Sequence, residues 1–312
     1  MRSRVRVLFI GGLGRSGSTL LDRVLGQTPG VCSAGELVFL WERGLAANER
    51  CGCGEPFRSC PFWTAVGERA FGGWDRVDVA AVLALKARVD RTRYVPFLLA
   101  PWLSPAYAVR RRRWTDELTR LYAAIGEVGG AEVIVDSSKH VSAAALLRFV
   151  PGVDARIVQL VRDPHGVAWS WAKEVERPDA TEGRSLMARV GSTRISIRWQ
   201  AQNLLLAVVR RRGAGPPMAA LRYEDVVDRP MEATRRLLAT AGLPAVGDLP
   251  QFTDERSVTL RVDHTVAGNP LRFRTGALQI RPDTEWREGM PRVRRVLVSV
   301  LAFPTSVGFG YR

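Results

Sequence analysis

A glycine-rich loop between an apolar strand and a helix, near the start of the chain, most constrains the fold. Val5–Gly11 is a short β-branched run typical of a buried strand, and Thr19–Gln27 carries leucine and valine at helical spacing. Between them lies the segment Gly12-Leu13-Gly14-Arg15-Ser16-Gly17-Ser18-Thr19. Glycines let the backbone approach an anion closely, and the free N–H groups and dipole of the following helix hold negative charge. This strand–loop–helix unit therefore predicts an anion-binding site.

The alternation of strand and helix recurs along the chain. Further pairs are predicted at Glu132–Asp136 with Val141–Val150, Arg156–Val161 with Pro164–Val175, and Met218–Arg222 with Met231–Ala241. Such alternation implies right-handed crossovers and a parallel sheet. We therefore expect an α/β protein with a P-loop-like three-layer fold around a central parallel sheet. We predict a single domain over residues 1–312.

Two long segments depart from this alternation. About residues 51–130 are mostly helical, with amphipathic stretches at Asp78–Asp90 and Arg112–Val128, and we predict a helical insert that covers the site. About residues 254–291 have poor periodicity and many polar side chains. We expect a long ordered loop there, and long loops in compact domains are often functional.

The charge of the chain favours anionic partners. The net charge is +15, and the 46 basic residues include only three lysines, Lys86, Lys139 and Lys173. Phosphate, sulfate, nucleic acid and acidic lipid all suit such a balance. A non-catalytic module for nucleic acid or an acidic membrane stays open on charge alone, although motifs typical of nucleic-acid-binding folds are absent. No stretch reaches the ~20 apolar residues of a membrane span, and we expect a cytoplasmic protein.

The loop nearly fits the ATP-binding pattern of glycine, four residues, glycine, lysine, and serine or threonine. Ser18 stands where that pattern has its lysine, the residue that reaches the terminal phosphates. A typical ATPase or GTPase is therefore disfavoured. A P-loop-like kinase of a small hydroxylated substrate stays open as a second interpretation.

Four segments in chain order carry a resemblance to a known family. They are Arg15–Leu21, Leu160–Pro164 with Val167 and Ser170, Leu221–Asp225, and Gly268–Arg274. On these residues the chain resembles the sulfotransferases that use 3′-phosphoadenosine 5′-phosphosulfate (PAPS), in particular the bacterial, tyrosylprotein-sulfotransferase-like branch. The resemblance spans about residues 5–290, and its first two motifs lie at the expected strand-to-helix junctions.

The resemblance implies transfer of a sulfuryl group from PAPS to a hydroxyl of a small molecule, glycan or lipid. The product is then adenosine 3′,5′-bisphosphate, and no metal is required. A nucleotide with phosphates at both ends of its ribose needs two anion sites, and arginine–phosphate contacts are the strong class of hydrogen bond. The cofactor-binding residues implied are Gly14, Arg15, Ser16, Gly17, Ser18, Thr19, Leu20, Arg162, Ser170, Tyr223, Arg272 and Arg274. Peripheral membrane contact and the oligomeric state stay open.

Glu36 is the predicted general base. It follows the first helix and a short extended stretch, and it resembles the base glutamate of the branch named above. General-base catalysis is worth about 10²–10⁴-fold in rate. A glutamate in the first turn of a helix at Leu37–Ala46, favourable to the helix dipole, is the open alternative. His140 and His165 are the alternative bases.

Lys139 and Arg15 complete the predicted catalytic set. Lys139 follows the strand Glu132–Asp136 in a chain that otherwise uses arginine almost everywhere. A compact ammonium suits the oxygen that bridges sulfate and phosphate. The resemblance also places a leaving-group lysine or serine near this position, and a surface lysine at a helix start is the open alternative.

Three of the four cysteines lie within ten residues of one another. Cys51, Cys53 and Cys60 leave three states open: free thiols, a disulfide, or a metal site with Cys32 or a histidine as fourth ligand. The spacing is not a standard zinc pattern, so no metal ligand is assigned. This segment follows Glu36 and is expected to border the acceptor, whose identity stays open.

Overall fold

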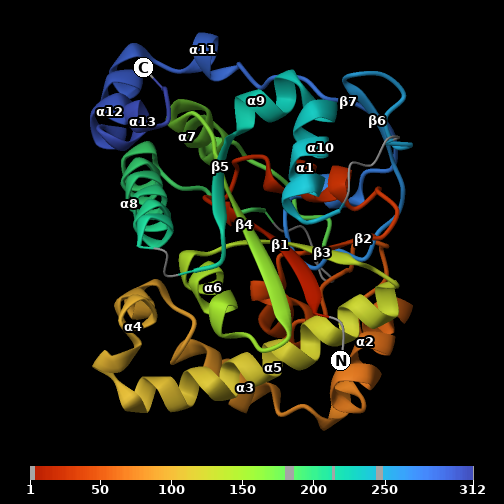
Figure 1. Ribbon diagram of the computed structural model, residues 1–312. Coiled ribbons are helices and arrows are strands. Elements are labelled where there is room, and N and C mark those ends of the chain that lie inside the picture. Colours follow the sequence, from red (N-terminus) through yellow and green to blue (C-terminus); the bar gives the residue numbers. More distant parts are fainter. Residues whose placement is uncertain (1–3, 180–185, 213–214, 244–248, 312) are drawn as a thin grey trace.

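Parallel strands form the centre of the protein in the computed structural model, which describes residues 4–179, 186–212, 215–243 and 249–311. Within these residues, five parallel strands make one sheet in the order β2-β3-β1-β4-β5 (Figure 1). They are β1 (Val5–Gly12), β2 (Val31–Gly35), β3 (Val133–Lys139), β4 (Val153–Val161) and β5 (Met218–Arg222). The predicted α/β fold with a parallel sheet is confirmed.

The first strand of the chain lies in the middle of the sheet. β1 is hydrogen-bonded to β3 on one side and to β4 on the other, so that Val7 faces both Ile134 and Ala155. Val7 and Phe9 pack into one core cluster, and Leu8 and Ile10 pack into another. Because helices cover both faces of such a strand, its sequence is apolar without alternation.

The sheet holds one strand more than the sequence predicts. β2 is made of small residues, Val-Cys-Ser-Ala-Gly, and pairs with β3 at the edge of the sheet, with an isolated parallel bridge from Gly35 to Val266 on its other side. The sequence indicated only a short extended stretch here. Glu36 follows β2 directly, and the predicted helix after it begins as a 3₁₀ turn, Leu37–Phe39, and continues as a π-helix, Leu40–Ala46.

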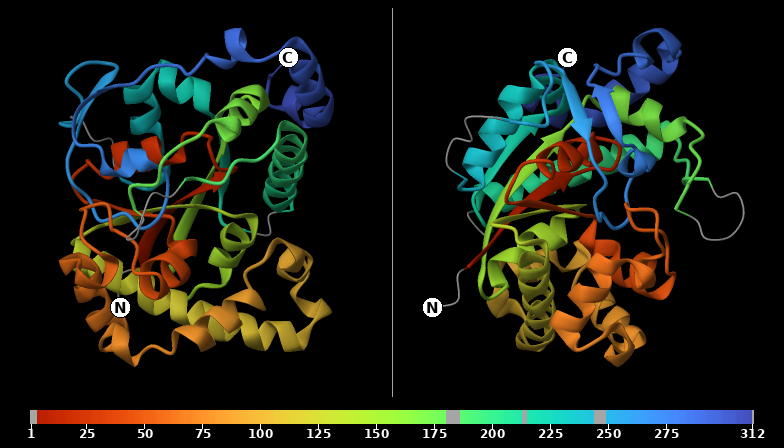
Figure 2. Two further views of the ribbon diagram at one scale, coloured as in Figure 1. Left: turned by 180° about the vertical axis from the view of Figure 1, so that it is seen from behind. Right: turned by 90° about the vertical axis from the view of Figure 1, so that its right-hand side faces the viewer.

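Helices cover both faces of the sheet (Figure 2). α1 (Ser18–Leu25), α9 (Tyr223–Asp228) and α10 (Pro230–Thr240) pack on the Leu8 face. α5 (Pro105–Gly129), α6 (Val141–Leu146) and α8 (Ser192–Arg211) pack on the Phe9 face. This arrangement is the predicted three-layer fold.

The remaining elements belong to the insert and to the later part of the chain. The insert helices gather at one end of the molecule (Figures 1 and 2). Its further helices are α2 (Pro61–Phe71), α3 (Val79–Ala87) and α4 (Val95–Leu99), with 3₁₀ turns at Phe57–Ser59, Trp74–Arg76, Thr92–Tyr94 and Pro101–Leu103. Elsewhere lie α7 (Pro164–Ala172), α11 (Trp286–Gly289), α12 (Arg292–Ala302), α13 (Thr305–Gly308) and a 3₁₀ turn at Leu147–Phe149.

The segment 254–291 is more regular than expected. It contains an antiparallel pair of strands, β6 (Ser257–Leu260) and β7 (Gly276–Gln279), and a 3₁₀ turn at Pro270–Phe273. The expectation of a loop throughout is therefore wrong. The strands have four residues each, too short for a clear alternating pattern in the sequence.

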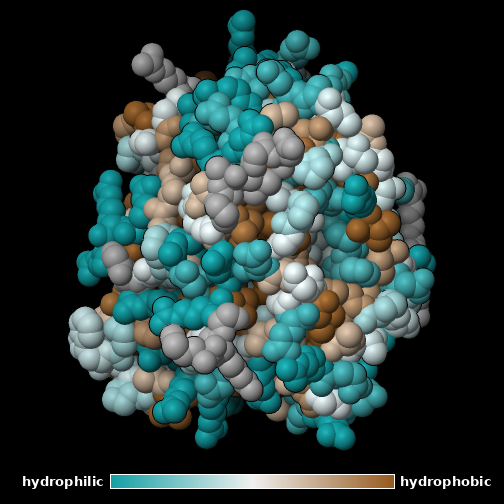
Figure 3. Space-filling model, turned by 45° about the vertical axis from the view of Figure 1, so that its right-hand side comes forward, coloured by the Kyte–Doolittle hydropathy of each residue, from teal (hydrophilic) through white to brown (hydrophobic). Residues whose placement is uncertain are grey.

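One face of the molecule is mostly polar. On the face shown in Figure 3, hydrophilic residues are widespread and hydrophobic ones form small separate groups. Among the described residues, no helix combines the length and the apolar character needed to cross a membrane.

Candidate functional site

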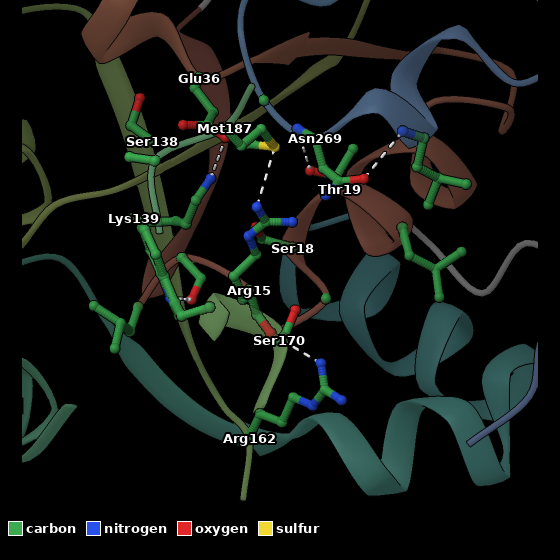
Figure 4. Close-up of a pocket in the computed structure, with 18 of the residues that line it drawn as sticks. Arg15, Ser18, Thr19, Glu36, Ser138, Lys139, Arg162, Ser170, Met187 and Asn269 are labelled. Atoms are coloured by element: carbon green, nitrogen blue, oxygen red, sulfur yellow. Dashed lines mark hydrogen bonds and ion pairs between the residues drawn. The ribbon is translucent and has the colours of Figure 1, made fainter. Parts of the chain in front are cut away.

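The carboxyl ends of the five central strands surround a cavity of about 750 Å³. Each strand is followed by, or ends in, a residue that lines this cavity: Arg15 after β1, Glu36 after β2, Lys139 at the end of β3, Arg162 after β4, and Tyr223 after β5. Ligands of open parallel sheets bind at this edge. The structure thus brings together residues that are far apart in the chain (Figure 4).

Two glycines give the loop after β1 its shape. Gly12 has φ 144°, and a Cβ there would lie 2.3 Å from the carbonyl oxygen of Leu160. Gly17 has φ 87°, and its Cβ would lie 2.4 Å from the Tyr223 ring. Any side chain at either position would collide with a neighbour and strain the backbone.

The loop presents the start of α1 to the cavity. Gly17 is the N-cap of α1 and offers no side-chain acceptor, so the first N–H groups of the helix are left for another partner. Ser18, Thr19 and Leu20 line the cavity, as do Gly14 and Gly17. Backbone N–H groups at a helix N-terminus suit a phosphate or sulfate.

Arg15 points into the cavity, and no carboxylate of the described residues forms an ion pair with it. Its Nη2 lies 3.2 Å from Met187 Sδ, and its guanidinium lies 5.7 Å from the centre of the Trp171 ring. Trp171 is held in turn by a 3.0 Å hydrogen bond from its Nε1 to the Gly14 carbonyl oxygen. Burial lowers the pKa of Arg15, while the negative charge of Glu36 opposes that change. A thioether and an indole do not neutralise the guanidinium, which is therefore available to an anion.

Glu36 and Lys139 form an ion pair in the cavity (Figure 4). Lys139 Nζ lies 2.6 Å from Glu36 Oε1, and each side chain is 10% exposed. Lys139 Nζ also donates to the carbonyl oxygen of Ser137 at 2.9 Å, and Lys139 has φ 69°, which non-glycine residues rarely adopt. A proton acceptor and a compact cation thus stand side by side.

A buried hub couples the strands that carry this pair. The Asp22 carboxylate, on α1, accepts hydrogen bonds from Ser33 Oγ at 2.6 Å and Ser137 Oγ at 2.8 Å. Ser33 is on β2, before Glu36, and Ser137 is on β3, before Lys139. Burial raises the pKa of Asp22 to about 7, although both hydroxyls lower it. The hub ties the helix of the anion loop to both strands.

Arg162 forms a second cationic point in the cavity. It is 5% exposed, donates from Nη1 to the Arg15 carbonyl oxygen at 3.0 Å, and lies 4.6 Å from the centre of the Tyr223 ring. Its Nη2 lies 2.8 Å from Asp283 Oδ2. Ser170, on α7, lines the same cavity. The Asp283 carboxylate thus occupies the end of the Arg162 guanidinium, where an anionic ligand would otherwise bind.

Asp283 is held ionised by this contact. Burial alone would raise the pKa of Asp283, but the hydrogen bond and charge of Arg162 outweigh burial and leave that pKa below its ordinary value. Asp283 could not be recognised from its sequence pattern, because it lies in a stretch of poor periodicity and far from Arg162 in the chain.

Three predicted residues do not reach the cavity. Ser16 is buried, and Arg274 is exposed with its carbonyl oxygen bound by Arg23. Arg272 is 1% exposed and donates to the carbonyl oxygens of Thr265 at 2.8 Å and Arg50 at 2.6 Å. Although the sequence shows no acidic partner for Arg272, its Nη2 lies 3.4 Å from Asp179 Oδ2. From the same segment, Gly268 and Asn269 do line the cavity.

The cavity is strongly basic. Among the described residues that line it, six are cationic and two are acidic, namely Arg15, Arg43, Lys139, Arg162, Arg177 and Arg198 against Glu36 and Asp283. Arg43, Arg177 and Arg198 were not singled out from the sequence, because nothing distinguishes them among so many arginines. Glu49 and Asp179 partner Arg43 and Arg177.

The three histidines differ in their surroundings. His140 lines the cavity, and burial lowers its pKa, which the nearby charge of Asp90 partly opposes. His165 has Nδ1 2.9 Å from Asp163 Oδ1 and Nε2 3.0 Å from Ser299 Oγ, and it is not among the described lining residues. His264 lies beside cysteines. By position, His140 is the histidine that competes with Glu36 for the role of base.

Comparisons with known proteins agree on one group. A sequence model of the sulfotransferase family matches residues 8–58 and 68–248, which include Arg15, Glu36, Lys139 and Arg162. Carbohydrate sulfotransferase 3 of Mus musculus is 26% identical over 173 residues, 52% of this chain. The match spans only 35% of the length of that relative.

Two solved structures share the fold. The sulfotransferase domain from the curacin biosynthetic pathway has a TM-score of 0.53 at 14% identity, covering 100% of this chain and 99% of that one. The sulfotransferase domain from the Synechococcus PCC 7002 olefin synthase has a TM-score of 0.51 at 19% identity, covering 100% and 97%. At these identities the likeness concerns the fold alone.

Proposed function

The chain belongs to the sulfotransferase family, and from this premise we propose that it moves a sulfuryl group from PAPS to a hydroxyl of a glycan, small molecule or lipid. The observation that carries the proposal is the pair of cationic points in one basic cavity. Arg15 and the amides of α1 form the first, and Arg162 with Ser170 forms the second. PAPS has anionic groups on both sides of its ribose, and two such points match them.

The Glu36–Lys139 pair supplies the chemistry that the transfer needs. The acceptor hydroxyl gives its proton to the Glu36 carboxylate while its oxygen forms a bond to sulfur. The bond between sulfur and the bridging oxygen breaks, and its electron pair stays on the 5′-phosphate. Lys139 and Arg15 stabilise that developing charge, as cations do in phosphoryl transfer.

Glycan hydroxyls are the first acceptor class to test. The name of the mouse relative points to a carbohydrate, and the cavity lining adds Phe39, His140 and Met187 beside the Glu36–Lys139 pair. Aromatic and polar groups together suit the faces and edges of a sugar.

Calorimetry distinguishes this function from phosphoryl transfer. We expect adenosine 3′,5′-bisphosphate to bind equally well with and without magnesium, and more tightly than ATP. Incubation with PAPS and a panel of sugars, phenols and alcohols, read by mass spectrometry, then identifies the sulfated product. Magnesium-dependent binding of ATP in preference to the bisphosphate would replace the proposal with the kinase interpretation.

Asp283→Asn is expected to tighten binding of adenosine 3′,5′-bisphosphate about tenfold, or about 1.4 kcal/mol. The carboxylate competes with the 3′-phosphate for Arg162, and a neutral amide competes less. Affinity for adenosine 5′-phosphate should change little. Asp228→Asn is the matched control, because it removes the same charge from an exposed ion pair with Arg256. Equal changes in both variants would show a general effect of charge.

A further inference from the structure

Three cysteines and a histidine converge outside the donor cavity. Cys51, Cys53 and Cys60 come from the start of the insert, and His264 follows β6. The four ligand atoms, three Sγ and the histidine Nδ1, lie within 4.8 Å of one another. None of the four residues is among the described residues that line the cavity.

The distances between these atoms fit a tetrahedron around one metal ion. Zinc binds sulfur at about 2.3 Å and nitrogen at about 2.0–2.1 Å, so tetrahedral ligand atoms stand about 3.4–3.8 Å apart. Cys60 Sγ lies 3.6 Å from Cys51 Sγ and 3.7 Å from Cys53 Sγ. His264 Nδ1 lies 3.8 Å from Cys51 Sγ, within this range, and 3.2 Å from Cys60 Sγ, slightly closer than an ideal tetrahedron sets it.

The surrounding chain is shaped to bring these ligands together. Cys51 is 1% exposed and Cys60 is fully buried. The His264 ring stacks on the Phe62 ring with centroids 5.0 Å apart. The backbone carbonyl oxygen of His264 accepts a 2.8 Å hydrogen bond from Trp63 Nε1. Packing of this kind around a metal ligand fixes the orientation of the ring and the nitrogen that it presents.

The glycines between the cysteines are also required by geometry. A Cβ at Gly52 would lie 2.6 Å from both Asp263 Oδ1 and Thr265 Oγ1, so only glycine lets the two segments approach. Gly54 has φ 96°, and its N–H donates to the Cys51 carbonyl oxygen at 2.8 Å. The resulting tight turn lets Cys51 and Cys53 aim at the same point.

The geometry points to a Zn²⁺ site formed by Cys51, Cys53, Cys60 and His264. Four protein ligands leave no open position, which is the mark of a structural rather than a catalytic zinc. Thiolate and imidazole ligands in tetrahedral arrangement select zinc over magnesium or calcium. Because these four residues are not among the described residues that line the cavity, such a site does not conflict with a sulfuryl transfer that requires no metal.

This zinc fastens the segment that borders the predicted base. Gly52 N–H donates to the Thr265 carbonyl oxygen at 3.0 Å, and Glu36 N–H donates to the Val266 carbonyl oxygen at 2.8 Å. Further along, a Cβ on Gly268 would lie 3.3 Å from Glu36 Oε1. The metal therefore joins the insert to the chain that packs against Glu36.

Metal content and cobalt spectroscopy of the full chain test the site. We expect the wild type, saturated with Zn²⁺ and freed of excess metal, to hold one equivalent of zinc per chain, as measured by elemental mass spectrometry. Co²⁺ in place of zinc should give the visible bands of a tetrahedral ion and thiolate-to-cobalt charge transfer. Cys60→Ser should lose the metal, whereas Cys32→Ser, the matched control at the fourth cysteine, should keep it.

The other outcomes are as clear. A wild type that takes up neither zinc nor cobalt in stoichiometric amount would overturn the site, as would equal retention of zinc by Cys60→Ser. Thiol titration of the unfolded, non-reduced chain distinguishes the metal site from a disulfide. Four reactive thiols after zinc removal agree with the metal site, and two indicate a disulfide instead. The cobalt spectrum uses only the wild type, so the test does not depend on whether a variant folds.

Discussion

Replacing Glu36 with glutamine is expected to slow sulfuryl transfer by about 10²-fold or more while the affinity for nucleotide stays within about twofold. Glutamine keeps the size of the side chain and an oxygen that can accept a hydrogen bond from Lys139 Nζ, 2.6 Å away in the wild type. It cannot accept the proton of the acceptor hydroxyl. Single-turnover rates with saturating PAPS, together with calorimetry of adenosine 3′,5′-bisphosphate, measure the two quantities separately.

The acidity of the acceptor provides an internal control. A nitrophenol, which loses its proton readily, should be slowed less in Glu36→Gln than an alkyl alcohol. If Glu36 served only as a charge near a helix terminus, stability would fall by about 0.3–1 kcal/mol and turnover would be nearly intact. His140→Gln is the parallel variant, because His140 lines the same cavity. Transfer that survives in Glu36→Gln and vanishes in His140→Gln would assign the base to the histidine.

Arg162→Ala is expected to weaken binding of adenosine 3′,5′-bisphosphate by about 1.5–3 kcal/mol, the net value of a hydrogen bond to a charged group. That loss corresponds to about a 10–150-fold rise in Kd. Adenosine 5′-phosphate lacks the 3′-phosphate and should bind nearly as before. Calorimetry with the two nucleotides measures the difference.

The Asp283 carboxylate also contributes to the affinity change expected in Arg162→Ala. Removing Arg162 leaves the Asp283 carboxylate without the guanidinium that it contacts at 2.8 Å, and its charge would then repel a phosphate. The double variant Arg162→Ala with Asp283→Asn removes this repulsion and isolates the contribution of the arginine. Ser170→Ala should weaken binding of the same nucleotide less, since the hydroxyl brings a hydrogen bond to the phosphate but no positive charge. Losses of equal size for both nucleotides would remove the assignment of Arg162 to the 3′-phosphate.

Sequence patterns predicted four of the five strands of the central sheet. The predicted bounds of β5 are those of the structure, and the bounds of β1, β3 and β4 were off by up to three residues. β2 was not recognised as a strand, because an edge strand of small residues has no strong pattern. The position of Glu36 could nevertheless be marked, since it follows the anion loop and its helix closely.

Residues brought in from distant loops could not be predicted. Arg43 and Arg177 line the cavity and form ion pairs with Glu49 and Asp179, and nothing in so arginine-rich a sequence distinguishes them from the other arginines. Asp283 meets Arg162, and His264 meets Cys60, across long stretches of chain. Contacts of this kind depend on the tertiary fold, whereas periodicity records only local structure and burial.

Because β1 lies between β3 and β4, it cannot pair with either strand until the ribosome has synthesised them. β1 is synthesised before both of its partners, so its two edges stay unpaired until Val133–Lys139 and Val153–Val161 have been made. An apolar strand with two open edges is prone to aggregate during that interval. The insert is made in the meantime, and its Trp63, Trp114 and Tyr122 pack into the cluster that also contains Val7 and Phe9. A nascent insert that folds as it emerges would shelter that strand until its partners arrive.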